Sequence, residues 1–364
     1  MKEDRGSLFH DILLILRAKK PSVVVLENVR NLSGPRHEHE WNFIVSSLQK
    51  IGYTVSNQPF VVSPHRIPPS FGGAPQARER VFIVGTFDED LKSKSKILTL
   101  APPVLPTDFD RWSPNSWNLI EDLNIVEGSK KTLLKYRISD EEKQVLEAWD
   151  DFVFCLLDER QGLRLPGFPL WSDLWGSTPA YKRQKNSPDW KVIFEEKNLQ
   201  FYEEHKTVID SWFKRNPCIR MASPSKRKLE WQAQDMQSIW DGLIHFRPSG
   251  IRVKRATYVP ALVAITQTSI VGPFKRRISP QEAALLQGLP NKFNFGDQSD
   301  SESYKQLGNG VSVGAATQVV YALVNRDKQI LRKINSKLLN SVKRKERRCL
   351  FDGEIEKNSV RNFA

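Results

Sequence analysis

The sequence predicts an α/β fold, with a largely parallel sheet within residues 1–100 and a second, less regular domain after them. Three observations favour this fold. Helical and extended patterns alternate through residues 1–100, as they do where helices connect parallel strands. Residues 23–26 form a short, continuous apolar run, which is typical of a strand buried on both faces. From Ala101 onward, prolines and tryptophans replace this alternation.

Apolar spacing and helix-stopping residues define the elements expected in the first domain. Apolar side chains recur at helical spacing after Ser7, and Lys19, Lys20 and Pro21 end that helix. Gly52 stops a second helical pattern. The expected elements are a helix at 7–19, a strand at 23–26, a helix at 41–51, an extended segment at 53–62, a Pro/Gly-rich loop at 63–75 and a strand at 80–85.

Beyond residue 100 the periodicity is poor. Tryptophans concentrate between Trp112 and Trp240, and we expect most of them in a core rather than on a base-stacking surface. Helical spacing returns at residues 280–287 and 311–324. After Arg326 the chain is polar and basic, so a flexible, solvated terminus is expected there.

Charge and composition limit the classes of function that this chain can have. The chain has 55 Lys and Arg against 42 Asp and Glu, a net charge of +13, which suits a polyanionic partner such as nucleic acid. A solvated basic surface would give the same charge, and composition leaves both explanations open. No apolar stretch approaches the roughly 18 residues of a membrane span, and the amino terminus is charged. We therefore expect neither membrane insertion nor secretion.

The three cysteines, Cys155, Cys218 and Cys349, have no regular spacing. This pattern argues against a disulfide framework and against a zinc site, and we expect no bound metal. It favours a reducing compartment, so a cytoplasmic, intracellular protein is expected.

Two polar motifs end strand patterns, at the place where open α/β sheets build their sites. Glu27 and Asn28 directly follow the apolar run at 23–26. Gln76, Arg78 and Arg80 stand at i, i+2 and i+4, so an extended backbone would point all three to one face. Two guanidinium groups on one face can bind an oxygen or a phosphate through bidentate hydrogen bonds. Taken singly, a capping carboxylate or solvated arginines would also explain these motifs.

These motifs, with two more downstream, resemble those of the DNA (cytosine-5)-methyltransferases. Glu27-Asn28-Val29 is similar to the family's catalytic glutamate motif, and residues 76–81 (Gln-Ala-Arg-Glu-Arg-Val) are similar to its Gln-x-Arg-x-Arg motif. Residues 277–290 are similar to the ninth motif and residues 304–311 to the tenth, while residues 5–9 look like the segment that opens the helix before the glutamate strand. Four motifs in the family's order argue against chance. The resemblance implies a partial Rossmann-like methyltransferase sheet and a smaller, irregular target-recognition domain.

The resemblance also implies a reaction, methyl transfer from S-adenosyl-L-methionine to carbon 5 of a cytosine flipped out of double-stranded DNA. A carboxyl group facing ring nitrogen 3 helps as negative charge builds there, and the match gives that role to Glu27. Arg78, with Gln76, would help to hold the flipped base, and Arg80 would support them. Asn28 looks like the family residue that braces the nucleophile loop.

Cofactor and DNA contacts are expected farther along the chain. Gly308, Asn309 and Gly310 precede a helical pattern, where small residues permit close backbone approach and exposed amides could face a ligand. By resemblance, Asn309 would lie nearest the methionine part of the cofactor, although the family more often has serine where Gly310 stands. An ordinary helix-entry turn is the alternative. The candidates for DNA contact, which can bind guanine edges or phosphates, are Arg247, Arg252, Lys254 and Arg255.

The expected domain bounds follow from these motifs. They are 1–100 for an incomplete catalytic domain, 101–272 for the target-recognition domain, 273–325 for motifs that return to the catalytic domain, and 326–364 for a basic tail.

The family's Gly-rich cofactor turn and Pro-Cys nucleophile have no match before Glu27. Cys218 follows Pro217, but it stands after the glutamate, which is the wrong order. We therefore expect a methyltransferase part from a restriction-modification system, inactive until a complementary chain supplies the nucleophile. A truncated or mis-started one-chain enzyme is an equal alternative, and a catalytically inactive, sequence-specific DNA-binding module is a further one. A strand edge left open in this way also predicts poor solubility of the chain alone.

Overall fold

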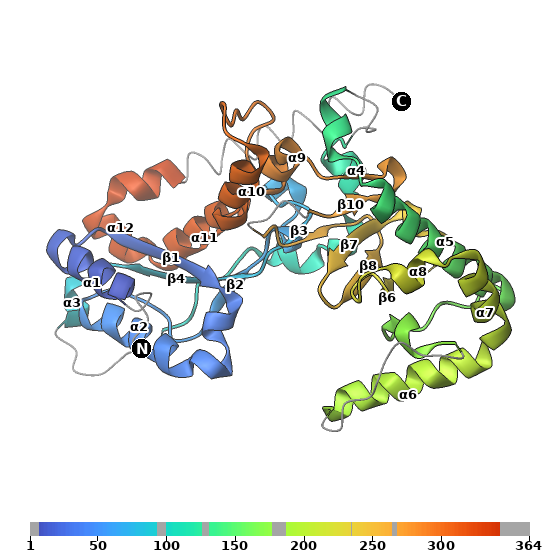
Figure 1. Cartoon of the computed structure of the whole chain (residues 1–364). Coiled ribbons are helices and arrows are strands. Elements are labelled where there is room, and N and C mark those ends of the chain that lie inside the picture. The colour runs from blue at the N-terminus through green and yellow to red at the C-terminus, as the bar shows by residue number, and fades with distance from the viewer. Residues whose placement is uncertain are drawn as a thin grey trace. The chain divides into compact units, whose positions relative to one another are not determined.

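The computed structural model describes residues 7–92, 100–125, 131–176, 187–233, 235–263 and 268–342. The described residues form two compact units, whose elements are labelled in Figure 1. Unit 1 draws on Met1–Pro114, Gln287–Leu289 and Val311–Ala364, and unit 2 draws on Asn115–Leu286 and Pro290–Gly310. Residues 5 and 6 of the expected helix-opening segment, the densest basic run at 343–348 and Cys349 lie outside the described residues. The domain bounds expected from the sequence stay a prediction.

A three-stranded sheet organises unit 1, in the order β1–β4–β2. β1 (Val23–Val29), β4 (Arg80–Thr86) and β2 (Phe60–Val62) all pair in antiparallel fashion. The α/β class expected from the sequence is confirmed, but the expected parallel pairing is wrong for these three strands. The chain turns back between β2 and β4 through the loop at 63–75, so these two strands become antiparallel neighbours without a crossover helix.

Helices cover both faces of this sheet, as Figure 1 shows. The helices of unit 1 are α1 (Ser7–Lys19), α2 (Glu38–Lys50), α3 (Glu89–Lys92), α11 (Val313–Arg326) and α12 (Lys328–Ile334). α1 and α2 share a core with Val81 and Ile83 of β4. α11 shares a second core with Phe82 and Val84. Since successive side chains of a strand point to opposite faces, this alternation along β4 places α11 on the face opposite α1 and α2.

β1 is more exposed than its apolar sequence suggests. Only Val24 is fully buried, whereas Val25 is 41% exposed and Val29 is 50% exposed. Within the described residues β1 has a neighbouring strand on one side, β4, and its other edge is free. The expectation that residues 23–26 are buried on both faces is therefore wrong for this chain, because an edge strand lacks the neighbour that would cover it.

The Pro/Gly-rich loop at 63–75 packs on the start of α11. Gln318 Nε2 donates a hydrogen bond to the Phe71 carbonyl at 2.9 Å. A Cβ atom on Gly314 would lie 1.7 Å from the carbonyl oxygen of Gly72, so the two backbones meet at a distance that only glycine at 314 permits. This contact fixes the loop that leads into the Gln-x-Arg-x-Arg motif.

A buried polar network joins the end of α11 to the segment before β2. Thr54 Oγ1 donates to Asp327 Oδ2 at 2.8 Å, and Arg326 Nη2 donates to the Thr54 carbonyl at 2.6 Å. Asp327 is buried, and each of these polar groups has a partner, so the network can persist without water. It ties α11 to the sheet at the end opposite the loop contact.

Unit 2 contains a six-stranded sheet in the order β11–β10–β7–β8–β6–β5. Only the β6–β8 pair is parallel among these pairs. The strands are β5 (Leu170–Trp171), β6 (Lys228–Gln232), β7 (Leu243–Arg247), β8 (Gly250–Lys254), β10 (Ile270–Val271) and β11 (Arg276–Arg277). The helices are α4 (Leu119–Asp122), α5 (Asp140–Glu159), α6 (Asp189–Glu204), α7 (Lys206–Arg215), α8 (Cys218–Met221), α9 (Pro280–Leu286) and α10 (Asp300–Asn309). Two further short strands are β3 (Gln76–Ala77) in unit 1 and β9 (Val259–Pro260) in unit 2.

Aromatic side chains fill the core of unit 2. Trp149, Trp175 and Trp212 are fully buried and lie within 6.4 Å of one another, measured between ring centroids. The expectation that the tryptophans are mostly core residues is confirmed for these, and Trp190, which is 58% exposed, is an exception. Each buried indole N–H of this group bonds to a backbone carbonyl, so burial leaves no polar atom of these rings unpaired.

One stretch, Asp300–Arg326, is long and apolar enough to pass for a membrane span by length and composition, contrary to expectation. The structure divides this stretch into α10 and α11, which are separated at Gly310–Ser312. Half of its apolar window is buried inside the protein. Both features are typical of core helices.

The Gly72–Gly314 contact predicts the effect of a single methyl group. Gly314→Ala would force the loop off α11, and overpacking of this kind costs about 1–3 kcal/mol. We expect the free energy of unfolding, measured by urea titration of the full chain, to fall by that amount. Gly167→Ala is the control, since a Cβ atom there meets nothing within 4 Å. Equal stability of the two variants would contradict the packing described.

Candidate active site and DNA-binding face

The β1–β4 ladder brings the two strand-end motifs together. Glu27 pairs with Phe82, and Val29 pairs with Arg80, so Glu27 and Arg80 are diagonal neighbours on one face of the sheet. Arg80 Nε lies 2.8 Å from Glu27 Oε1, and the two side chains are 17% and 25% exposed. The ion pair holds the carboxylate in a fixed orientation at the end of β1.

Arg78 and Gln76 lie deeper than Arg80. Gln76 is fully buried and Arg78 is 3% exposed. The Arg78 backbone N–H donates to the Gln76 carbonyl at 3.0 Å and to Ser63 Oγ at 3.0 Å. A hydrogen bond between residues i and i+2 closes a tight turn, so the expected extended row at 76, 78 and 80 is interrupted. Burial, followed by the nearby Arg80 charge and partly offset by Glu27, lowers the pKa of Arg78 to about 10, and the guanidinium stays charged at neutral pH.

Glu79, which the sequence analysis did not single out, forms a second link between the motifs. Its carboxylate pairs with Arg30, which directly follows β1, and lies 3.6 Å from Arg66 Nη2 in the Pro/Gly-rich loop. In the sequence, the feature that points to Glu79 is its position between Arg78 and Arg80. Glu79 thus ties the segment after β1 to the loop that precedes β4.

Asn28 lies on the opposite side of β1 from Glu27, because consecutive strand residues alternate. It is exposed, and its Oδ1 accepts a hydrogen bond from the Val29 N–H at 2.8 Å. The Asn28 side chain therefore bonds to the backbone of the next strand residue.

Gly308 and Asn309 form the last turn of α10, and Gly310 caps it. The Gly310 N–H bonds to the Gln306 and Leu307 carbonyls, so the expected turn with exposed amides is a helix end instead. These residues belong to unit 2, whereas Glu27 and the arginines belong to unit 1. Asn309 is exposed, which leaves its side-chain amide accessible for a polar ligand such as an amino acid moiety.

The two described cysteines lie in unit 2 and are not activated. Burial raises the pKa of Cys155, as does the neighbouring Asp151 carboxylate, although Arg215 Nη2 lies 3.0 Å from the sulfur. Burial also raises the pKa of Cys218 at the start of α8. A raised pKa leaves little thiolate at neutral pH, so neither sulfur has the environment of a strong nucleophile.

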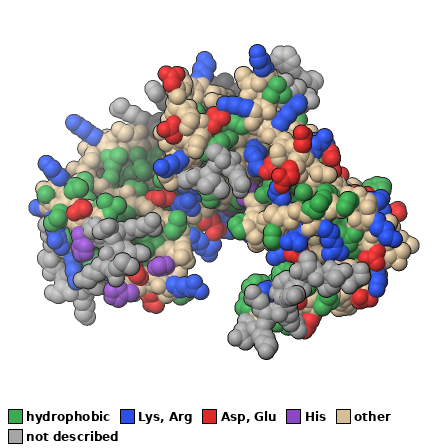
Figure 2. Space-filling view, viewed as in Figure 1, with side chains coloured by type: hydrophobic (Ala, Val, Ile, Leu, Met, Phe, Trp, Pro, Cys, Tyr) green, Lys and Arg blue, Asp and Glu red, His purple; other side chains and the backbone are tan. Residues whose placement is uncertain are grey.

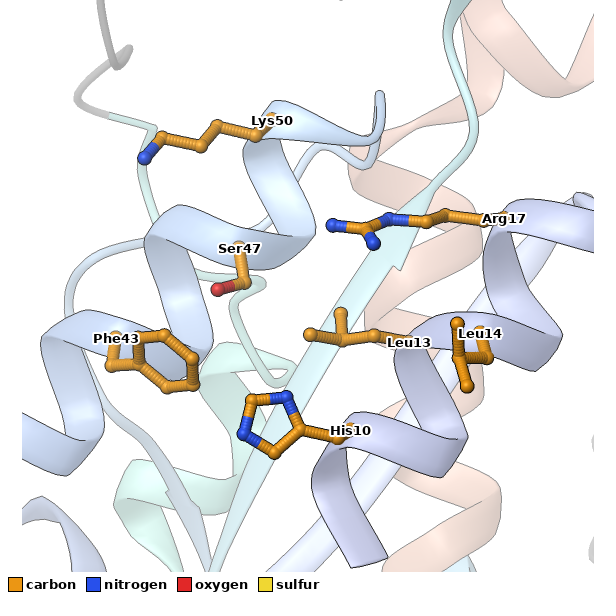
Figure 3. Close-up of a pocket in the computed structure, with 7 residues that line it drawn as sticks. All are labelled: His10, Leu13, Leu14, Arg17, Phe43, Ser47 and Lys50. Atoms are coloured by element: carbon orange, nitrogen blue, oxygen red, sulfur yellow. The ribbon is translucent and has the colours of Figure 1, made fainter. Parts of the chain in front are cut away.

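A cavity of about 440 Å³ opens between α1 and α2 in unit 1 (Figure 3). Neither Glu27 nor an arginine of the second motif lines it, so this cavity is separate from the candidate active site. Its lining residues are His10, Leu13, Leu14, Arg17, Phe43, Ser47 and Lys50.

Three of the four candidate DNA contacts share one face of the unit 2 sheet, which we call the polar face. Arg247 on β7 and Arg252 and Lys254 on β8 occupy alternate positions, and the residues between them point into the core. Both arginines pair with Glu230 on β6, and Lys254 Nζ lies 3.4 Å from the centroid of the Tyr258 ring. The polar face consists of Lys228, Glu230, Gln232, His245, Arg247, Arg252 and Lys254.

Arg255 differs from the other three candidates. It follows β8 and forms an ion pair with Asp235, in which the two side chains are 52% and 57% exposed. Such an exposed pair contributes little to stability. Lys and Arg side chains, with Asp and Glu among them, are also scattered over the face seen in Figure 2, so exposed charge alone does not single out Arg255.

The family model for C-5 cytosine-specific DNA methylase matches residues 1–325. The chain therefore belongs to the C-5 cytosine-specific DNA methylases, a family of methyltransferases that modify DNA.

Named relatives point the same way. The chain is 37% identical over 399 residues to the Type II methyltransferase M.AluI of Cellulosimicrobium cellulans, covering 91% of this chain and 76% of that protein. It is 26% identical over 343 residues to the Type II methyltransferase M.BanI of Aneurinibacillus aneurinilyticus, covering 87% of this chain and 74% of the relative. Among solved structures, the S. pombe Dnmt2 methyltransferase covers 88% of this chain and 72% of its own at 15% identity, with a TM-score of 0.33, a likeness too weak to bear on the fold.

Lys254 predicts a pH dependence of stability. Burial, with Arg252 beside it, lowers the pKa of Lys254 from 10.5 to about 8. Between these two values the unfolded chain binds more protons than the folded chain, so this group's contribution to stability rises with pH. We expect the difference in the free energy of unfolding, wild type minus Lys254→Met, to increase as the pH rises from about 8 to about 10. A difference between the two proteins that is constant with pH would contradict burial of the ammonium group.

Proposed function

We propose that this chain carries the catalytic acid, the base-holding arginines and the target-recognition face of a DNA cytosine-5 methyltransferase. The observation that carries this proposal is the Glu27–Arg80 ion pair beside the buried Arg78. A carboxylate fixed by one guanidinium, with a second guanidinium close by, can bind the polar edge of a base that has left the DNA stack.

Each residue has a distinct role in the proposed chemistry. A thiolate adds to carbon 6 of the flipped cytosine, and Glu27, facing ring nitrogen 3, shares a proton as negative charge develops in the ring. Arg78 holds the base through its cationic side chain, and Arg80 orients Glu27. Gln76 supports the turn that positions Arg78. Carbon 5 then takes the methyl group, and loss of its proton restores the ring and releases the thiolate.

The methyl group comes from S-adenosyl-L-methionine, whose sulfonium supplies an electrophilic carbon. Among the residues assigned to cofactor binding, Asn309 fits best, because its exposed amide can bond to the methionine part. Gly308 and Gly310 would allow the ligand to approach the helix end. Since the Gly310 N–H already bonds within the chain, the side chain of Asn309 rather than a free backbone amide makes the contact in this proposal.

The nucleophile in this proposal comes from a polypeptide other than these 364 residues. The raised pKa values of Cys155 and Cys218 support this. The free edge of β1 and the exposure of Val25 and Val29 also support a partner that pairs along this strand. The partner would supply both the thiol and the remaining cofactor contacts, and a longer form of the same chain is the competing source.

The wider setting follows from the relatives. The names of M.AluI and M.BanI are those of Type II methyltransferases, so we propose that this chain acts on double-stranded DNA in a restriction-modification system, in the cytoplasm. Arg247, Arg252, Lys254 and Arg255 are the proposed DNA contacts.

Mixing the purified chain with a family segment that carries the Gly-rich turn and the Pro-Cys motif tests the proposal. We expect labelled methyl groups to enter DNA as 5-methylcytosine only when both polypeptides are present. DNA binding without any methylation in the mixture would favour the catalytically inactive DNA-binding module instead. Methylation by the chain alone would exclude the requirement for an outside thiol.

Glu27→Gln separates catalysis from binding in the reconstituted enzyme. Loss of a positioned general acid–base group lowers the rate by about 100-fold or more, so we expect that loss in single-turnover methylation. The Kd for DNA should stay within about threefold, because Glu27 contacts only the flipped base in this proposal.

Glu40→Gln is the matched control for this test. Glu40 is an exposed carboxylate of unit 1 that contacts His37 and lies outside the proposed site. Its methylation rate should equal that of the wild type. An unchanged rate in Glu27→Gln would overturn the catalytic assignment.

A further inference from the structure

A single carboxylate on the polar face holds two arginines at once. Glu230 Oε2 accepts hydrogen bonds from Arg252 Nε at 2.9 Å, from Arg252 Nη2 at 2.8 Å and from Arg247 Nη1 at 2.9 Å. Its other oxygen, Oε1, accepts a hydrogen bond from Ser249 Oγ at 3.3 Å. The two guanidinium groups are therefore fixed relative to each other through one atom.

The sheet register makes this arrangement rigid. Glu230 on β6 pairs with Arg252 on β8, and Arg252 pairs with His245 on β7. Arg247 lies two residues beyond His245, so it stands in the next row of the same face. On the reverse face, the intervening residues of all three strands are packed in the core, for example Ile251. Sites built on strands hold their geometry better than sites built on loops.

Burial strengthens the effect of the carboxylate. The Glu230 side chain is 12% exposed, and those of Arg247 and Arg252 are 29% and 34% exposed. Charges in this position are screened less by salt than charges at the surface. Side chains that are already ordered also lose less conformational freedom when a ligand binds. Arginine has five N–H donors, and Glu230 uses only some of those on each guanidinium.

His245, which lies on the polar face beside the two arginines, adds no charge to this face. Burial, followed by the charges of Arg247, Arg252 and Arg277, lowers the pKa of His245, so His245 is neutral at neutral pH. Its Nδ1 lies 3.4 Å from Ser269 Oγ. His245 can therefore act as a hydrogen-bonding group between the two arginine rows without adding charge.

A carboxylate in this position opposes simple attraction to DNA. It reduces the positive charge of the face, and phosphate binding depends on that charge. The effect of Glu230 is instead to orient the guanidinium groups of Arg247 and Arg252. Orientation matters because a guanidinium that reads guanine must match the O6 and N7 acceptors of the base. Resting on the proposed function, we propose that Glu230 is a positioning residue, which fixes Arg247 and Arg252 to read guanine edges in the major groove of the target.

Base preference in a library of random DNA duplexes tests this role. The full-length chain selects duplexes from the library, and sequencing gives the preference at each position. Glu230→Gln keeps the size of the side chain but removes its charge, so we expect the guanine preference to fall about tenfold or more. Total affinity for the library should stay equal or rise, since the face becomes more positive. Arg252→Lys should lose the same preference at unchanged net charge, because lysine lacks the fork.

Asp235→Asn is the matched control. It removes the carboxylate that faces Arg255 in an exposed pair, so it changes the net charge by the same amount as Glu230→Gln. We expect a similar rise in total affinity and an unchanged base preference. Circular dichroism melting of each variant checks that the chain is folded. If Glu230→Gln proves unfolded, Arg252→Lys decides the result.

Three outcomes would overturn this inference. The first is a guanine preference that survives in both Glu230→Gln and Arg252→Lys, and the second is an equal loss in Asp235→Asn. A wild-type chain that binds the library without any base preference also contradicts it. In that case, methylation by the reconstituted enzyme still tests the proposed function independently.

Discussion

The antiparallel pairing of β1 with β4 is the constraint on which the candidate active site depends. Glu27 and Arg80 are 53 positions apart in the sequence, and the ladder from Val23↔Thr86 to Val29↔Arg80 makes them neighbours. A slip of one residue would move Arg80 to the opposite face and separate the pair. The core that α1 and α2 form with one face of the ladder, and α11 with the other, holds this register.

Two further contacts keep the arginine motif in place around this pairing. The close approach of Gly72 to Gly314 seats the Pro/Gly-rich loop on α11, and Glu79 ties that loop to Arg30 after β1. Arg78 lies between these two fixed points and is buried. The site is thus supported by backbone packing and ion pairs rather than by the sheet alone.

The sequence predicted the nearness of Glu27 and Arg80 because both positions belong to motifs of one family's active site. It could not predict the strand direction, since β1 and β4 pair through contacts distant in the sequence. The regular spacing at 76, 78 and 80 predicted an extended backbone, but the Arg78 N–H bonds to the Gln76 carbonyl and turns the chain there. Such a turn cannot be detected from the alternation of side chains along a strand. It also depends on the buried Ser63 hydroxyl, which accepts a hydrogen bond from the Arg78 N–H.

The downstream regions show the same limits of local reasoning. Gly308 and Asn309 precede the helix α11 as expected, but the capping box formed by Ser299 and Glu302 starts α10 earlier, so these residues also end a helix. That Ser-x-x-Glu spacing was readable in the sequence. Glu230 was not, because its partners stand 17 and 22 positions away in a region without clear periodicity. Only the sheet register reveals that one acid orients two arginines.

Covalent trapping on DNA that contains 5-fluorocytosine tests the central claim most directly. A thiolate that adds to carbon 6 of this base stays attached after methyl transfer, because the fluorine on carbon 5 cannot leave as a proton does. With the chain, S-adenosylmethionine and a family segment that carries the Gly-rich turn and the Pro-Cys motif present, mass spectrometry of the trapped peptide should locate the bond on a cysteine outside these 364 residues. A bond to Cys155, Cys218 or Cys349 would contradict a site that joins Glu27 and Arg80 to a thiol supplied from elsewhere.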